Sequence, residues 1–396
     1  MSVPDPRSAL SVRLSNRLVG VDVARCLALL GMMATHVLDP VTASGDVTRV
    51  QELAGGRSAA LFAVLAGVSL ALMTGGRSPV HGHVLRSRAL GLGVRAMLIA
   101  AIGLLLGALD TDVAIILTYY WVLFLLGLPF LGLRARWLWL LGVAWIVIGP
   151  LLSMGIRPML PERRFASPDP TQLLEPGRLV SELLFTGYYP AVPWLAYLLI
   201  GMAIGRIDLR NRMVVDMVWT SGIIVSISAT WLSGRLTRLP SVAAELVRTY
   251  PELDLDGVLT KIGLGMFGQT PVDGGWQWLL VVAPHSSTPF DLAQTVGSSM
   301  FFIGACQMIS LRLSERWRTA VAVFFGAGAM TLTLYTLHVV MLTDAVWPAE
   351  RPGTYVIHVL VVLAIGAAVM AWGRPGPLEW LVRQPSAWLR RAEPRP

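Results

Sequence analysis

Charged residues are scarce in this chain. Of its 396 residues only 14% are charged, whereas 55% are hydrophobic, and soluble domains carry about 25% charged residues. The low charge excludes an ordinary soluble protein, and repeated apolar runs of about 20 residues predict transmembrane helices. Because no polar linker separates these runs, we expect an all-α polytopic membrane protein with one helical bundle.

Cysteine and lysine are also nearly absent. The two cysteines, Cys26 and Cys306, lie in apolar runs and have no partner at metal-ligand spacing, so we predict neither a disulfide framework nor a metal site. Lysine occurs once, and the net charge of +8 comes from arginines spread in clusters between the apolar runs. That distribution is typical of topology signals, and we therefore expect no nucleic-acid partner.

The apolar runs predict about ten transmembrane spans. Arginine clusters precede the first span and follow every second one, so the positive-inside rule places both termini in the cytoplasm of a multi-pass plasma-membrane protein. The first run is too long for a signal-peptide core, and we expect it to be retained. The expected organisation is a cytoplasmic N-terminal tail at 1–17, a bundle at 18–373 and a cytoplasmic C-terminal tail at 374–396. The spans are 18–38, 58–75, 90–109, 113–132, 137–155, 189–205, 213–232, 292–311, 320–342 and 354–372.

Two long segments, about 156–188 and 233–291, are expected on the outer side. In the second, "SVAAELVRTY" and "DGVLTKIGLGMF" predict short amphipathic helices. Pro190 and Pro193 lie at the outer end of the sixth span, where they indicate either a broken helix lining a cavity or prolines in a first helical turn. The "GAGA" at 326–329 predicts close helix packing, and glycine-lined helices are compatible with a homodimer.

The first span holds the densest set of polar residues. Arg25 and His36 are eleven positions apart, which places both on one helix face, separated by about 16 Å along the axis. Asp22 precedes Arg25 by one turn and Asp39 follows His36 by one turn. An imidazole with a carboxylate partner suits a general base, and a guanidinium suits a phosphate or carboxylate. The alternative is that Arg25 extends to the cytoplasmic interface with Asp22 as its counter-ion.

Further candidates lie at the expected outer level. Tyr335 and His338 in the ninth span either line the same cavity as His36 or make a structural polar contact. His285, in the second outer segment, is placed to contribute from above. Arg57 begins the second span, where it can anchor to headgroups, pair with Asp39 or Asp46, or bind substrate.

The first span also resembles a known family. "RLVGVDVARCLALLGMMATHV" is similar to the first-helix signature of membrane acyltransferases, with an Asp-x-x-Arg followed by a small or apolar run and His or Asn. It most resembles the bacterial relatives of heparan-alpha-glucosaminide N-acetyltransferase, including YeiB-like proteins, which are related to acyltransferase family 3. "RSAALFAVLAGVSLAL", "GAGAMTLTLYTLHVV" and "RPGPLEWLVRQPSAW" add to the resemblance. The chain departs from it at Cys26, where glycine is usual, and at His36, where YeiB-like proteins often have Asn.

This resemblance implies a transmembrane acyltransferase bundle that takes acyl-CoA from the cytoplasm. Carried over to this chain, it implies His36 as catalytic base and Arg25 as a donor-side or structural partner. In the mechanism we expect, Asp39 orients His36, and Arg25, Arg86 and Arg88 hold the CoA phosphates. The remaining candidates Tyr335, His338, His285 and Arg57 would bind acceptor or thioester. The expected reaction moves an acyl group such as acetyl or succinyl to an envelope glycan or glycolipid. Two alternatives are a transporter or flippase of an acylated or glycosylated envelope lipid, and a non-enzymatic membrane scaffold.

Overall fold

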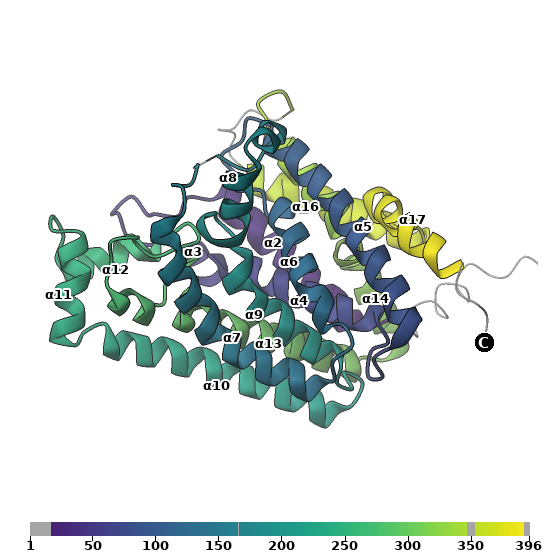
Figure 1. The fold of residues 1–396 in the computed structure, drawn as a ribbon. Coiled ribbons are helices and arrows are strands. Elements are labelled where there is room, and N and C mark those ends of the chain that lie inside the picture. The colour runs from purple at the N-terminus through teal and green to yellow at the C-terminus, as the bar shows by residue number, and fades with distance from the viewer. Residues whose placement is uncertain (1–16, 165, 347–352, 392–396) are drawn as a thin grey trace, which may run out of the picture.

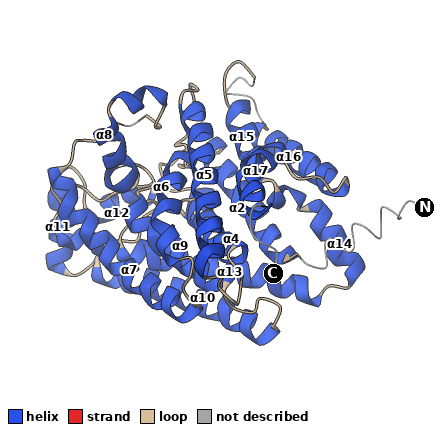
Figure 2. Ribbon diagram, turned by 45° about the vertical axis from the view of Figure 1, so that its right-hand side comes forward, coloured by secondary structure: helices blue, strands red, loops and turns tan. Residues whose placement is uncertain are grey.

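The computed structural model describes residues 17–164, 166–346 and 353–391. Apart from one bridge between Val41 and Val47, all regular structure in these ranges is helical (Figure 2). The first half contains α2 (Val19–Val37), α3 (Arg49–Ala54), α4 (Arg57–Met73), α5 (Gly82–Gly107), α6 (Leu117–Gly127) with η1 (Leu128–Phe130), α7 (Ala135–Ile156) with η2 (Arg157–Met159), η3 (Pro170–Leu174), α8 (Pro176–Ser181), η4 (Glu182–Thr186) and α9 (Ala191–Gly205).

The second half continues the bundle and adds the helices of the outer segment. It contains α10 (Arg212–Leu236), α11 (Pro240–Thr249), α12 (Leu255–Gly263), η5 (Trp276–Leu280), α13 (Pro289–Arg312), α14 (Glu315–Phe324), η6 (Gly326–Ala329), α15 (Thr331–Met341), α16 (Thr354–Ala371) and α17 (Pro377–Arg391). The segment expected as a C-terminal tail thus forms α17, which packs against α5 (Figure 1). The expected N-terminal tail lies outside the described residues, except for Arg17.

Seven helices of the described chain are long and apolar enough to cross a membrane. An eighth crossing results if α8 with η4 and α9, which are bent by 54°, form one span. Pro190 caps α9 and Pro193 lies in its first turn, so this span is both broken and proline-capped. The chain is therefore a multi-pass helical membrane protein, as the composition predicted.

Two of the ten expected spans differ from the prediction. The fourth is reduced to Leu117–Phe130, and the ninth is split into α14, η6 and the short α15. The split falls at the "GAGA" stretch, where Gly328 meets the backbone of α2: a Cβ on Gly328 would lie 1.8 Å from the carbonyl oxygen of Asp22. Close packing at this stretch is confirmed, and the tight contact leaves room only for glycine at position 328.

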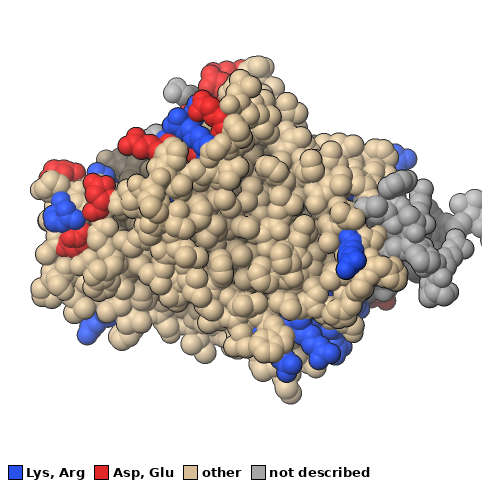
Figure 3. Space-filling model, viewed as in Figure 1, with Lys and Arg blue, Asp and Glu red and all other residues tan. Residues whose placement is uncertain are grey.

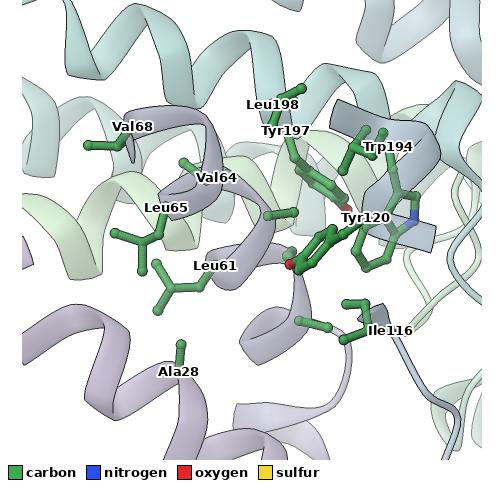
Figure 4. Close-up of a cluster of buried hydrophobic side chains, with 14 of the residues drawn as sticks. Ala28, Leu61, Val64, Leu65, Val68, Ile116, Tyr120, Trp194, Tyr197 and Leu198 are labelled. Atoms are coloured by element: carbon green, nitrogen blue, oxygen red, sulfur yellow. The ribbon is translucent and has the colours of Figure 1, made fainter. Parts of the chain in front are cut away.

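The bundle is built around α9, which is buried along almost its whole length. It packs against α4, α6 and α7, while α13 packs against α10, α2 and α4 (Figure 1). Trp194 and Tyr197 of α9 meet Leu61 and Val64 of α4 and Tyr120 of α6 in this core (Figure 4). The outward faces of α7 and α10 expose large apolar side chains, which is what a lipid-facing surface requires.

The two expected amphipathic helices are confirmed as α11 and α12. Both lie beyond one end of α10 (Figure 1). Val242 and Leu246 of α11 pack with Val258 and Ile262 of α12 around Trp278, forming a small core separate from that of the bundle. The second long segment is therefore a folded cap with its own apolar centre.

Loops 74–81, 131–134 and 206–211 meet at one end of the bundle, which we call the basic end. Arg206 joins all three, since its guanidinium donates to the carbonyl oxygens of Gly76 and Leu131. Arg77 pairs with Asp208 across two of them at 2.8 Å. Figure 3 shows Asp and Glu mostly at the top and left, near α8 and α11, where some Lys and Arg lie among them, and a group of Lys and Arg at the lower right. The arginine clusters of alternate loops thus converge on one end.

Candidate active site

The Asp–Arg pair of the first span is confirmed. Nη1 of Arg25 lies 2.8 Å from Oδ1 of Asp22, whose other oxygen accepts from Arg17. Nη2 of Arg25 donates to the hydroxyl of Ser69 on α4 at 2.7 Å. Because two partners on two helices hold its guanidinium, Arg25 has a fixed position close to the basic end.

A cavity of about 360 Å³ begins at this arginine. It passes between α2, α4, α5 and α6 and ends near α15, with a largely apolar wall. Arg25 and Arg95 line it toward the basic end, and Met32 of α2 lines it farther along. Its lining also includes Leu65, Ile116 and Tyr120, which appear in Figure 4, together with Phe62, Ser69, Phe124, Leu332, Tyr335 and Glu379.

Two tyrosines with hydroxyls unpaired among the described residues line the far part of this cavity. Tyr120 and Tyr335 both line it, both are nearly fully buried, and neither hydroxyl makes a hydrogen bond within the described chain. The amide of Ile116, at the start of α6, lies near the hydroxyl of Tyr335 without reaching hydrogen-bond geometry. Buried donors without a partner are rare in folded proteins. They are placed to bind an oxygen of a molecule that enters the cavity.

Two further cavities adjoin the first at the basic end. One, of about 580 Å³, shares Arg25 with it and is also lined by Arg17, Arg77 and Arg210. The other, of about 330 Å³, shares Arg95 and is lined by Arg17 as well. Guanidinium groups, together with the carboxylates of Asp22, Asp208 and Glu379, thus line the cavities at this end. Guanidinium groups next to a largely apolar cavity suit a ligand with an anionic head and a long neutral arm.

Arg86 and Arg88 were expected in this role, and the structure places them outside the three cavities. Arg86 is exposed on the first turns of α5, and Arg88 donates to the carbonyl oxygen of Met73 at 3.1 Å. The sequence analysis missed Arg95, which lies two turns farther along the same face of α5 as Arg88. An arginine inside an apolar span was the signal that could have identified it.

His36 lies in the last turn of α2, as predicted, but its partner is different. Its Nδ1 is 3.1 Å from Nε2 of His338 on α15, and Nδ1 of His338 is 2.7 Å from Nδ1 of His358 on α16. The expected contact with Asp39 is not present, because the helix ends at Val37 and extended backbone carries Asp39 to the exposed surface. The sequence analysis missed His358, a histidine inside the last apolar span.

The cavity and the histidines are adjacent on two helices. Met32 lines the cavity on α2 and precedes His36 by one turn, about 6 Å along the axis. Tyr335 lines it on α15 and precedes His338 by three residues, about 4.5 Å along the axis. The histidine pair therefore lies just beyond the far part of the cavity.

A family model described as "Heparan-alpha-glucosaminide N-acetyltransferase, catalytic" matches residues 17–236, which is more than half of the chain. The chain belongs to this family. A comparison with curated proteins gave no match.

Membership in the heparan-alpha-glucosaminide N-acetyltransferase family indicates an acetyltransferase-type membrane enzyme. The matched residues run from Arg17 to the end of α10 and include Arg25, Arg95, Tyr120 and His36. Proteins of this kind use acetyl-CoA as donor. Arginines line all three cavities, and the wall of the first is largely apolar.

His285 and Arg57 lie beside the histidines at the other end of the bundle. The ring of His285 packs against Tyr188 and Tyr189 with centroids 4.8 and 5.5 Å away, and it lies parallel to Trp194. Burial, with a smaller contribution from the charge of nearby His36, lowers the pKa of His285 to about 3. Its Nδ1 makes no hydrogen bond within the described residues, so this aromatic group can receive a polar ligand atom.

Arg57 pairs differently from the expectation. Its guanidinium donates to the carbonyl oxygen of Glu52, and the carboxylate of Asp291 attracts it electrostatically. The expected partners, Asp39 and Asp46, are not involved. The backbone of His285 approaches Gly56 closely, since a Cβ there would lie 3.3 Å from the amide nitrogen of His285. Arg57 therefore lies next to the His285 loop.

In the described part of the chain, no group of three or more His, Cys, Asp or Glu side chains is arranged to hold a metal ion. The three histidines of the site form a line through their ring nitrogens and do not converge on one point. The expectation that the protein needs no metal remains a prediction.

Proposed function

We propose that this protein transfers an acyl group, most simply acetyl, from cytoplasmic acyl-CoA to an amine or hydroxyl of an extracytoplasmic glycan or glycolipid. The observation that carries the proposal is the cavity lined by Arg25, Arg95, Tyr120 and Tyr335. Its lining residues Met32 and Tyr335 precede His36 and His338 by about one helical turn. Such a passage can bring a thioester from one side of a membrane to a base near the other.

The proposed topology has ten crossings, with the basic end in the cytoplasm. Its support is the convergence of the arginine-rich loops on one end, which is the cytoplasmic side under the positive-inside rule. The short helices Leu117–Phe130 and Thr331–Met341 complete the ten crossings in this arrangement. Both termini are then cytoplasmic, and the cap formed by α11 and α12 faces outward from the plasma membrane.

The arginines at the entrance bind the anionic part of the donor in this proposal. Arg25 and Arg95 line the passage itself, while Arg17, Arg77 and Arg210 surround it. Arginine suits this task because its planar guanidinium binds phosphate oxygens in pairs. The pantetheine arm of the donor would follow the apolar wall toward the two tyrosines.

The chemistry takes place between the tyrosines and the histidine. The hydroxyls of Tyr120 and Tyr335 donate hydrogen bonds to the thioester carbonyl oxygen, which gains negative charge when the acceptor attacks. His36 removes the proton of the acceptor, whose sugar would lie against the aromatic group around His285. This assignment keeps the predicted role of His36 and adds Tyr120.

The test is transfer from acetyl-CoA to glucosamine by purified protein in proteoliposomes, with release of the CoA thiol as the readout. We expect His36→Ala to lower kcat by about 10²–10⁴-fold, the usual contribution of a general base, with little change in acetyl-CoA binding. Arg95→Ala should instead raise the KM for acetyl-CoA. The matched control is Arg212→Ala, because Arg212 is exposed at the basic end and lines none of the described cavities.

Unchanged kcat in His36→Ala would contradict the assigned base. Glycolipid movement across the membrane without any dependence on acetyl-CoA would contradict transfer and support the transport alternative. Stable co-purification of envelope enzymes together with failure to bind acetyl-CoA would support the scaffold alternative.

A further inference from the structure

Three imidazoles on three helices form a continuous chain in the outer part of the bundle. His36 and His338 lie with their ring planes 13° apart and a nitrogen–nitrogen distance of 3.1 Å. His338 and His358 are nearly perpendicular, at 82°, with a nitrogen–nitrogen distance of 2.7 Å. Both distances are within hydrogen-bond range. Every link in the chain is therefore an imidazole-to-imidazole hydrogen bond.

Such a chain has only two internally consistent arrangements of protons. A neutral imidazole has one N–H and one lone pair, so His338, bonded at both nitrogens, must donate on one side and accept on the other. If it donates to His358, it accepts from Nδ1 of His36, and Nε2 of His36 keeps its lone pair. If it accepts from His358, Nε2 of His36 carries a proton. The state of Nε2 of His36 is thus linked to His358, two rings away.

Imidazole here takes the position that a carboxylate occupies in many base–orienter pairs. Within the described residues, no carboxylate hydrogen-bonds His36 or His338, and Asp39 is exposed. His338 and His358 are fully buried, where a polar side chain is costly and is usually functional in a membrane protein. Among the described residues, His285 from the loop before α13 is close enough to His36 for an electrostatic interaction.

The helices that carry the three rings are fixed in register by small residues. Gly328 contacts the backbone of α2 at Asp22. Gly366 of α16 contacts Ala327: a Cβ added to Gly366 would lie 2.3 Å from the amide nitrogen of Ala327. The hydroxyl of Tyr355 on α16 also donates to the carbonyl oxygen of Leu30 on α2 at 3.3 Å. These contacts join α2 and α16 to each other and to η6, which leads directly into α15, and they restrict sliding between the helices that carry the imidazoles.

We infer that His338 and His358 are positioning residues that act through His36, setting the tautomer of its ring and sharing the proton it takes from the acceptor. The inference rests on the proposed function. As the acceptor nitrogen or oxygen bonds to the thioester carbon, its proton moves to Nε2 of His36. The Nδ1 proton of His36 then passes to Nε2 of His338, and the Nδ1 proton of His338 passes to Nδ1 of His358.

The same shift in reverse completes the reaction. When the carbon–sulfur bond breaks, its electron pair stays on sulfur as the CoA thiolate. The protons move back along the chain, and Nε2 of His36 gives its proton to that sulfur. The products are the acylated acceptor and the CoA thiol, and all three imidazoles are neutral again. The step requires no oxidant, reductant or further proton.

Two substitutions of His358 separate hydrogen bonding from packing. His358→Phe keeps a ring of similar size but removes the acceptor for Nδ1 of His338. His358→Asn keeps a polar group that can accept that hydrogen bond but takes up no proton. We expect kcat to fall about 10²-fold in the Phe variant and about tenfold in the Asn variant, within the range for general-base catalysis. The KM for acetyl-CoA should stay the same, and the acidic limb of the kcat–pH profile should move to lower pH in both variants.

A spectroscopic measurement keeps the test independent of activity. In protein labelled with ¹⁵N-histidine, N–H···N hydrogen bonds give couplings between the two nitrogens. We expect two such couplings in the parent, loss of the His338–His358 coupling in both variants, and no change in His83→Ala, whose histidine is exposed at the start of α5.

The outcomes distinguish the two claims. An active parent with both couplings and slowed variants supports the inference. A folded His358→Phe variant with the kcat and pH profile of the parent overturns it, as do missing couplings in an active parent. If the parent shows both couplings but no acetyl transfer, the proposed function is refuted, and with it the catalytic role of the three histidines. The hydrogen bonds between the histidines would still be confirmed.

Discussion

The hydroxyls of Tyr120 and Tyr335 should improve activity at the expense of stability. Each is buried without a hydrogen bond in the described chain, and leaving a buried polar group unpaired costs about 1–3 kcal/mol. Tyr120→Phe keeps the ring, which stacks on Phe124 with centroids 5.6 Å apart, and removes only the oxygen. We therefore expect the free energy of unfolding to rise by about 1–3 kcal/mol in the Phe variant.

Activity should change in the opposite direction. If the hydroxyl donates to the thioester oxygen in the transition state, its removal should lower kcat by about 10²–10³-fold, the usual loss for one oxyanion donor. Tyr335→Phe should likewise raise the free energy of unfolding and lower kcat. Because both hydroxyls would serve one oxygen, the double variant should lose less than the product of the two single losses.

The assays are thermal unfolding in detergent, followed by tryptophan fluorescence, and transfer from acetyl-CoA. The matched control is Tyr197→Phe, because the buried hydroxyl of Tyr197 bonds Oγ1 of Thr295 at 2.8 Å. Its loss should lower the free energy of unfolding by about 1 kcal/mol. A Tyr120→Phe variant that is less stable than the parent, or that turns over at the same rate, would refute the assignment.

Two further predictions concern packing and pH. Gly328→Ala should lower the free energy of unfolding by about 1–3 kcal/mol and reduce turnover, because the added Cβ would lie 1.8 Å from the carbonyl oxygen of Asp22. The control Gly93→Ala should not destabilise the protein, because Gly93 has open space around it. Equal thermal unfolding of the two variants would contradict the packing argument. The pKa of His285 is about 3 in the folded protein and about 6.5 when unfolded, so the unfolded state binds the proton first and stability should fall from about pH 6.5 toward pH 3. His285→Asn tolerates the positive φ of 56° and should reduce that loss in unfolding measurements across this range; identical slopes would show that His285 does not titrate this way.

Local patterns were enough to predict the first span and its ion pair. The predicted span 18–38 agrees with the observed helix Val19–Val37. A long apolar run in a membrane forms a helix because the helix satisfies its backbone hydrogen bonds internally. Asp22 and Arg25 are three residues apart, so helix geometry alone brings them together. The same reasoning was wrong for Asp39, because a helix end depends on where the chain must turn next.

Contacts between helices were much harder to predict. Arg95, Tyr120 and His358 each lie in an apolar span, and nothing in their local sequence says which side of the helix faces a cavity. His338 was named correctly as a neighbour of His36, yet its link to His358 depends on the register of α15 against α16. That register follows from glycine contacts far apart in the chain.

The sequence by itself determined that this protein is a bundle of membrane helices with its arginines between alternate spans. Composition and helix periodicity act over a few turns, and they suffice for that conclusion. Only the tertiary structure decided that three histidines join in one chain and that two tyrosines with hydroxyls unpaired in the described part of the protein line one cavity. The reason is physical: packing shape selects one arrangement of helices among many that bury the same apolar area, and that arrangement chooses the partners of each buried polar group.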